Sequence, residues 1–184
     1  MEWLHDYNKA LEVAQGQRKP ILLQFEMDNC GGCKRLEKDT YKDEKLIAEM
    51  QEWFVLLKLD LIKDREIRKN FSAYWTPAFY FLNEFGKSHY FFNGYLPANE
   101  MRALIRLALS ELLIPKGKYD AVIEIISKDI NKLENTSFYP KLLVQRGLAE
   151  YIKTKDKEKF KGIIKSIIEK YPYSTEAKMY FWED

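Results

Sequence analysis

The spacing of apolar residues along the chain predicts alternating helices and strands. Helical segments place an apolar residue at every third or fourth position, and they are predicted at residues 3–16, 35–38, 43–50, 64–71 and 98–113. Short apolar runs between polar segments predict strands at residues 21–27, 53–60, 77–82 and 89–92. This order, with a crossover between the first two strands, indicates a mixed central sheet flanked by helices. The predicted fold class of this part of the chain is therefore α/β.

The pattern changes near residue 115. Pro115-Lys116-Gly117 interrupts the last predicted helix, and the sequence from Lys118 onward is rich in Lys, Ile and Tyr with no strand pattern. Proline and glycine in close succession are a strong signal for a break between elements. We therefore predict two regions, an α/β domain over residues 1–114 and an all-α extension over residues 115–184.

The extension contains weak internal repetition. Residues 119–126 resemble residues 160–167 at an offset of 41 residues (160 − 119), which is longer than the tetratricopeptide period of about 34. Gly147-Leu148-Ala149, followed by a helix ending at Tyr171-Pro172, nevertheless resembles a tetratricopeptide helix pair. The resemblance implies a helical-repeat-like extension. Such an extension caps the first domain, forms a dimer contact or binds a peptide in a concave face, and all three roles stay open.

Composition narrows the function classes. The 184 residues carry a formal net charge of +2 (30 − 28) with both signs interspersed, and 46% of them are hydrophobic. Such a balance gives no reason to expect nucleic acid or a membrane surface as a partner. No run of about 18 apolar residues predicts a membrane span. The first residues lack the basic and apolar regions of a signal peptide, so we expect a cytoplasmic protein.

The candidate chemistry lies in a single segment, residues 29–34, which contains both cysteines of the chain, Cys30 and Cys33. A buried strand precedes this segment and a helix follows it, so a dithiol is placed at the first turn of a helix. The unpaired N–H groups of that turn favour an anion, and Lys34 lies beside it. In such a setting the pKa of a thiol, about 8.5 when free, falls by one or several units. Cys30 is the predicted nucleophile, and Cys33, one turn further and less exposed, is the predicted resolving cysteine.

Other roles of a cysteine pair are to bind a metal ion or to form a structural disulfide. A structural zinc ion needs four ligands, and beyond the two cysteines the chain offers only His5 and His89, far apart in sequence. A dimer that pools four cysteines around a metal has no support in the sequence. A purely structural disulfide across so short a loop constrains little of the unfolded chain. We therefore predict a redox dithiol that needs no metal and no organic cofactor.

Residues 3 to about 110 resemble the thioredoxin superfamily, and within it the C-terminal domain of the DsbD-type bacterial thiol transporters. The resemblance rests on a Lys-Pro strand entrance at residues 19–20, the Cys-x-x-Cys pair, Thr76-Pro77, and the turn at residues 83–87. It implies a thioredoxin fold followed by the helical extension.

The resemblance also implies the surroundings of the dithiol. Thr76–Pro77 is then a cis peptide bond packed against the cysteines, and the backbone of Thr76 is available to pair with an extended substrate segment. Gly94 lies in the same substrate groove, where the lack of a side chain allows close approach. Trp75 is either an apolar contact for partners or a packed core aromatic.

Three positions depart from the family pattern. Asn29 stands where the family usually has Trp, and Gly31-Gly32 lacks the usual proline between the cysteines. Gln24 replaces a buried Asp, and an amide cannot accept a proton from Cys33. The candidate replacement is Glu37, because DsbD-like domains carry an acid at the same position; Glu26 is a poorer second. Glu37 can equally be a solvated helix carboxylate.

The sequence thus predicts a thiol–disulfide oxidoreductase, mainly a reductase, because cytoplasmic conditions favour dithiols. Its partners are a disulfide-containing protein substrate and an unidentified electron donor, and it acts as a monomer or as a homodimer through the extension. The alternative is a scaffold without catalytic activity, whose helices bind a protein partner. The cysteines favour the enzyme; Asn29, the Gly-Gly spacer and Gln24 favour the scaffold.

Overall fold

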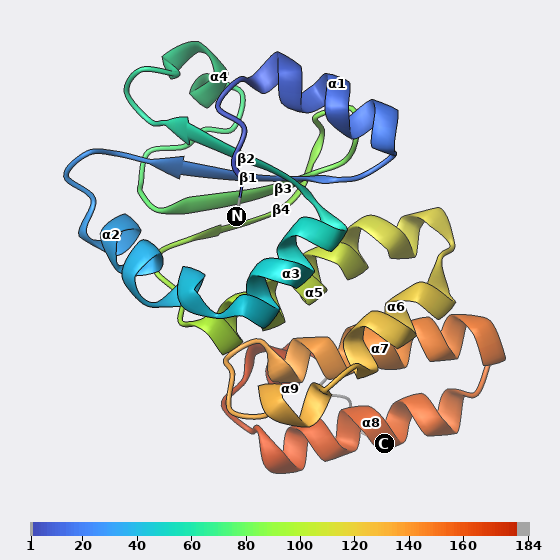
Figure 1. The fold of residues 1–184 in the computed structure, drawn as a ribbon. Helices are drawn as coiled ribbons and strands as arrows, with labels where there is room; N and C mark the ends of the chain where they lie inside the picture. The colour runs from blue at the N-terminus through green and yellow to red at the C-terminus, as the bar shows by residue number, and fades with distance from the viewer. Residues whose placement is uncertain (1, 180–184) are drawn as a thin grey trace. The chain divides into compact units, whose positions relative to one another are not determined.

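Residues 2–179 contain one four-stranded sheet in the order β2-β1-β3-β4 (Figure 1). The computed structural model describes residues 2–179. Strands β1 and β2 are parallel, whereas β3 is antiparallel to both β1 and β4. The predicted mixed sheet and the hairpin are therefore confirmed. The strands are β1 (Ile21–Glu26), β2 (Val55–Asp60), β3 (Ala78–Leu82) and β4 (Ser88–Asn93).

Strand β1 lies in the interior of the sheet and is buried along all but its last residue. Its apolar run satisfies the requirement of a strand that is covered on both faces. The register pairs Gln24 with Lys58 on β2 and Phe25 with Ala78 on β3. Side chains at alternate positions point to the same face, so Gln24 and Lys58 lie side by side on one face of the sheet.

Helices cover both faces of the sheet in this part of the chain. Ala10 and Ala14 of the first helix pack with Leu23, Leu57 and Tyr80 in one buried cluster. Figure 1 shows α1 and α4 on this face and α2 and α3 on the opposite one. The opposite face is the one that carries Gln24 and Lys58. The helices are α1 (Tyr7–Gln17), α2 (Gly31–Lys38), α3 (Glu44–Trp53) and α4 (Arg65–Lys69), with a short 3-10 turn at Thr40–Lys42.

The first helix begins later than the apolar pattern predicts. It starts at Tyr7 rather than at Trp3, because the Asp6 carboxylate accepts the N–H of Lys9 at 2.8 Å and caps the helix. The residues before it are extended, and Leu4 forms an isolated parallel bridge with Leu57 of β2. The apolar positions at the start of the chain thus extend the sheet instead of the helix.

Beyond the sheet the described chain is helical, as predicted for the extension. The chain divides into two compact units between Met101 and Arg102, within α5 (Ala98–Leu113). The predicted break at residues 115–117 is a 3-10 turn, Ile114–Lys116, followed by Gly117 with a φ of 69°. The remaining elements are α6 (Tyr119–Ser127), a 3-10 turn (Ile130–Leu133), α7 (Tyr139–Thr154), α8 (Lys157–Lys170) and α9 (Thr175–Met179).

The C-terminal helices pack through their own apolar cluster, in which Val144 of α7 contacts Ile164 and Ile167 of α8. Gly147 allows the close approach, since a Cβ there would lie 2.9 Å from Cδ1 of Ile163. Over residues 2–179, none of the helices has both the length and the apolar content needed to span a lipid bilayer.

Candidate active site

The dithiol segment lies where β1 meets α2. Strand β1 ends at Glu26, a loop of three residues follows, and Cys30 is the N-cap residue of α2. Its Sγ accepts the N–H of Cys33 at 3.0 Å, and its own N–H donates to the carbonyl of Met27. A sulfur atom thus takes the place of the oxygen that usually caps a helix. The first-turn N–H group points at Cys30, as the sequence predicts.

Cys30 and Cys33 form a disulfide, with an S–S distance of 2.05 Å and a Cα–Cα distance of 5.2 Å. Each residue has 5% of its surface exposed. The two residues are thus equally buried, whereas the sequence predicts a more exposed Cys30. The N–H of Cys33 holds the Cys30 sulfur over the first turn of the helix, which accounts for the burial of Cys30.

A loop with a cis peptide bond between Thr76 and Pro77 lies against the dithiol turn. A Cβ on Gly32 would lie only 2.8 Å from Cδ of Pro77, so the proline ring packs directly on the residue before Cys33. The cis bond that the family resemblance implies is confirmed. Gly94, with a φ of 120°, donates its N–H to the carbonyl of Pro77 at 2.8 Å and so joins this loop to the end of β4.

The surface around the dithiol is polar on one side and aromatic on the other. Asn29, Gly31 and Lys34 are exposed at the start of α2. On the side of the proline loop, Tyr74 and Trp75 are 79% and 59% exposed. Trp75 is therefore not a packed core aromatic. These two exposed rings precede the cis-proline loop in the chain, and exposed aromatic rings form a surface that apolar side chains of a protein partner can cover.

Gln24, which replaces the family's acid, is fully buried and hydrogen-bonded at both ends of its amide. Its Oε1 accepts the phenol O–H of Tyr41, and its Nε2 lies 3.5 Å from Oε2 of Glu26. Burial, together with the nearby carboxylates of Glu37 and Glu26, raises the pKa of Tyr41 well above its usual value. The phenol therefore stays protonated, and the Gln24–Tyr41 pair is neutral.

The positive charge at this face of the sheet is the ammonium group of Lys58. Its Nζ lies 2.6 Å from Oε1 of Glu37 and 3.5 Å from Oε2 of Glu26, while the lysine side chain is only 9% exposed. Glu37, 53% exposed, is both a solvated helix carboxylate and the partner of a buried ammonium group. It also lies four residues after Cys33 on α2, which places the two side chains on the same helix face.

Sequence reasoning missed the roles of Lys58 and Tyr41. A signal for Lys58 exists, because it is the one charged residue inside the apolar run of β2 and stands in register with Gln24. A charged side chain in a buried strand needs a partner. No comparable signal marks Tyr41, since only the fold brings its hydroxyl to the amide of Gln24.

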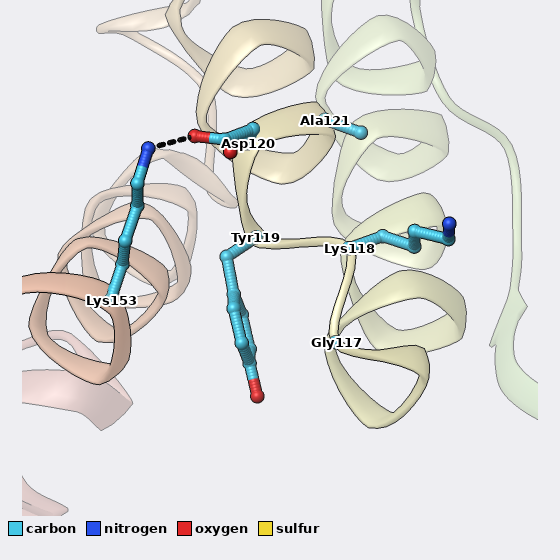
Figure 2. A pocket seen from close by; sticks show the side chains of 6 residues that line it. All are labelled: Gly117, Lys118, Tyr119, Asp120, Ala121 and Lys153. Carbon is cyan, nitrogen blue, oxygen red and sulfur yellow. Dashed lines mark hydrogen bonds and ion pairs between the residues drawn. The ribbon is translucent and has the colours of Figure 1, made fainter.

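Among the described residues, neither a metal site nor the cavity of the helical unit coincides with the dithiol site. Within residues 2–179, no group of three or more His, Cys, Asp or Glu side chains is arranged to hold a metal ion. A separate cavity of about 340 Å³ lies in the helical unit, where Lys153 and Asp120 form an ion pair across it (Figure 2). Its walls are Gly117, Lys118, Tyr119, Asp120, Ala121 and Lys153. None of the predicted site residues lies among them.

Substitution of the two glycines between the cysteines should affect stability to different extents. Gly32→Ala places a methyl group against the rigid ring of Pro77, and we expect it to destabilise the oxidised protein by about 1–3 kcal/mol. Gly31→Ala meets open space and is expected to change stability by less than about 1 kcal/mol. Urea unfolding of both variants measures the difference. Equal stabilities would contradict the packing of Pro77 on Gly32.

The hydroxyl of Tyr41 predicts a pH-dependent stability difference. Tyr41→Phe leaves the buried Oε1 of Gln24 without its donor and is expected to cost about 1–3 kcal/mol near pH 8. Because the pKa of Tyr41 is raised in the folded state, its contribution is complete below the unfolded pKa of about 10 and is lost at higher pH. Urea unfolding at about pH 8 and pH 10.5 should therefore show wild type and variant converging. If the difference in the free energy of unfolding between wild type and Tyr41→Phe is the same at both pH values, the buried phenol is not the source of that difference.

Comparisons with known proteins agree with this geometry. Residues 7–109 match the family model of a thioredoxin-like domain. The thiol:disulfide interchange protein DsbD of Campylobacter jejuni is 27% identical over 104 residues, which cover 54% of this chain and 18% of that protein. Thioredoxin-1 of Drosophila melanogaster is 31% identical over 81 residues, 44% of this chain and 71% of that protein. The matched part of the chain thus spans between 10% and 18% of the length of the DsbD proteins that it matches.

Solved structures show the same fold. The solution structure of a candidate disulphide isomerase from Bacteroides thetaiotaomicron superposes with a TM-score of 0.53 at 28% identity, over 59% of this chain and 91% of that one. The oxidised C-terminal domain of DsbD from Neisseria meningitidis gives a TM-score of 0.50 at 16% identity, over 58% of this chain and 99% of that one. Residues 7–109, which the family model matches, contain the dithiol, the proline loop and all four strands. The chain therefore belongs to the thioredoxin-like family, with residues 7–109 as its thioredoxin-like domain.

Proposed function

We propose that the protein is a thiol–disulfide oxidoreductase that reduces disulfides in protein substrates through Cys30-Gly31-Gly32-Cys33. The observation that carries the proposal is the Cys30–Cys33 disulfide at the first turn of α2, packed beside the Pro77 loop. Relatives named as a thiol:disulfide interchange protein and a thioredoxin support the reaction type.

The reaction proceeds by two exchanges of a sulfur–sulfur bond. The Cys30 thiolate attacks one sulfur of the substrate disulfide, forms a mixed disulfide and releases the other sulfur as a thiolate, which takes up a proton. The Cys33 thiolate then attacks Cys30 Sγ, releases the second substrate thiol and forms the Cys30–Cys33 bond. Two electrons and two protons pass to the substrate. A dithiol electron donor must then return the Cys30–Cys33 disulfide to its reduced form.

The start of α2 stabilises the attacking thiolate. The N–H of Cys33 lies 3.0 Å from Cys30 Sγ, and a hydrogen bond to a charged acceptor is stronger than one to a neutral acceptor. The positive end of the helix dipole acts in the same direction. Both effects favour the thiolate over the thiol, and a thiolate is the species that attacks a disulfide.

Glu37 is the proposed proton acceptor for Cys33. Gln24 cannot fill this role because its amide has no basic site and both of its ends are already hydrogen-bonded. Glu37 lies one helical turn beyond Cys33, and its exposed carboxylate can release the proton to solvent. The ion pair with Lys58 holds that carboxylate at the same side of α2.

The proline loop and Gly94 form the proposed substrate surface. Trp75 offers an exposed ring, and Thr76 and Pro77 offer backbone beside the disulfide for an extended segment of the substrate. Gly94 lies next to this backbone through its hydrogen bond to Pro77. An unfolded or extended protein segment with apolar side chains is the substrate class that fits this surface.

The proposed direction of the reaction is reduction of the substrate disulfide, in the cytoplasm, where the redox potential of the thiol pool keeps dithiols reduced.

The helices of the second unit are proposed to form a tetratricopeptide-like extension. The contact of Gly147 with Ile163 and Phe160 supports this assignment, because it joins two antiparallel helices at a residue without a side chain. The extension then serves as a cap or as a homodimer contact, and the active protein is a monomer or a homodimer.

The dithiol reaction predicts different outcomes for its two cysteines. Wild type should accelerate insulin reduction by dithiothreitol. The rate with Cys30→Ser should be lower by about tenfold or more, since no nucleophile remains. Cys33→Ser should stall at the mixed disulfide, and mass spectrometry should identify a substrate linked to Cys30. Wild type no faster than Cys30→Ser, with no linked protein recovered, would favour a scaffold without catalytic activity.

The proton-acceptor role predicts a difference between two carboxylates that both approach Lys58. Glu37→Gln should slow the resolution of the mixed disulfide by about tenfold or more, because Cys33 loses its base. Glu26→Gln removes an equal charge from β1, and not from the helix that carries Cys33, and serves as the matched control. Rapid-quench measurement of mixed-disulfide decay tests both variants. If the two variants slow this step equally, Glu37 is not the base.

A further inference from the structure

The first residues of the described chain form part of the ion cluster beside the dithiol. Leu4 donates its N–H to the carbonyl of Leu56 and accepts the N–H of Lys58, each at 2.9 Å. The Nδ1 of His5 lies 3.1 Å from the carbonyl of Lys58. These bonds fasten residues 3–5 to the edge of β2, like a short additional strand.

Side chains alternate between the two faces of the sheet along this added strand, and this alternation determines the face on which Trp3 lies. Leu4 packs into the apolar cluster under α1, so its neighbour Trp3 turns to the opposite face, the face of Gln24 and Lys58. The ring of Trp3 lies 4.8 Å from Nζ of Lys58 and 5.8 Å from the ring of Tyr41. Its buried Nε1 donates no hydrogen bond within residues 2–179. Ring contacts, and not a polar bond, therefore hold the indole in place.

The ammonium group of Lys58 is consequently enclosed by four side chains. Two carboxylates approach it, Glu37 at 2.6 Å and Glu26 at 3.5 Å. Two aromatic rings cover its remaining sides, Trp3 at 4.8 Å and Tyr41 at 5.9 Å. A ring face attracts a cation and excludes water at the same time, which strengthens the nearby charge interactions.

We propose that Trp3 is a positioning residue for the dithiol reaction, acting through Lys58. Its ring keeps the ammonium group dehydrated and fixed, so that Lys58 holds Glu37 one turn beyond Cys33 and offsets the negative charge of both carboxylates. The inference rests on the proposed function, because it assigns Trp3 a part in the same site. Trp3 does not touch the cysteines.

The sign of the effect follows from charge. The reduced state carries a thiolate, and a fixed positive charge nearby favours it over the uncharged disulfide. Without the ring, the ammonium group of Lys58 is no longer held in place and moves out toward water, so less positive charge remains to offset the two carboxylates, which then oppose the thiolate more strongly. Loss of the ring should therefore shift the equilibrium toward the disulfide.

The test is the equilibrium constant of Cys30–Cys33 with glutathione, measured for single and double variants. Trp3→Leu should shift this constant at least about threefold toward the disulfide, which is about 14 mV for a two-electron couple. Trp3→Phe keeps a ring and should stay within about twofold of wild type. In a Lys58→Met background, Trp3→Leu should have no further effect. An unchanged Trp3→Leu, or an equal shift with and without Lys58, would overturn the proposal.

A control separates positioning from general loosening of the N-terminal region. Tyr7, on α1, packs against Phe71 on the other face of the sheet. Tyr7→Leu should lower the unfolding temperature and leave the glutathione constant unchanged; a shift equal to that of Trp3→Leu would refute a specific role of Trp3. If Trp3→Leu does not fold, Trp3→Met supplies apolar volume without a ring and the same outcomes apply.

The glutathione equilibrium needs only the dithiol and no protein substrate. A shifted constant in Trp3→Leu together with wild-type protein that cannot reduce insulin would reject the proposed function and keep the coupling of Trp3 to Lys58. If wild type reduces insulin but the glutathione equilibrium constant of Trp3→Leu is unchanged, the proposed function is kept and the coupling of Trp3 to Lys58 is rejected.

Discussion

The pairing of β1 with a neighbour on each side is the constraint from which the geometry of the site follows. The parallel register with β2 brings Lys58 next to Gln24. The antiparallel register with β3 puts Ala78 opposite Phe25, so Pro77, the residue before Ala78, arrives at the end of β1 where the dithiol begins. A slip of one residue in either ladder would move these side chains to the opposite face. The sheet therefore positions the charge, the proline and the sulfurs together.

A buried lysine beside a neutral amide needs a compensating partner. Taking an ammonium group out of water is costly unless a negative charge meets it, and a carboxylate at position 24 would meet it directly. Gln24 cannot, and the structure supplies the charge from two other residues, Glu37 of α2 and Glu26 at the end of β1. The carboxylate nearer to the ammonium group thus lies on the helix that carries Cys33. Glu37, the proposed proton acceptor, and Cys33, the proposed resolving cysteine, then lie on one helix face, which is the arrangement that the proposed reaction requires.

The secondary structure can be predicted from the sequence where the apolar residues of a segment fit either a strand or a helix, but not both. The strand before Cys30 is a continuous apolar run, and the helix after Cys33 follows from the spacing of Leu36 with its charged neighbours, so the position of the dithiol between them was predictable. The start of the chain was not, because Trp3 and Leu4 fit a helical stripe as well as a strand edge. The choice between them depends on the free hydrogen-bonding edge of β2, and that edge exists only in the folded sheet.

Side-chain partners were predictable only in part for the same reason. The candidate role of Glu37 came from a family resemblance, whereas its ion pair with Lys58 depends on the register between β1 and β2 and on how α2 packs across them. The two glycines show the limit most clearly. In the sequence Gly31 and Gly32 are equivalent sources of flexibility at a helix start, yet only Gly32 faces the ring of Pro77. The Gly-Gly spacer then reflects packing at one position and tolerance at the other, and it does not by itself argue against a catalytic dithiol.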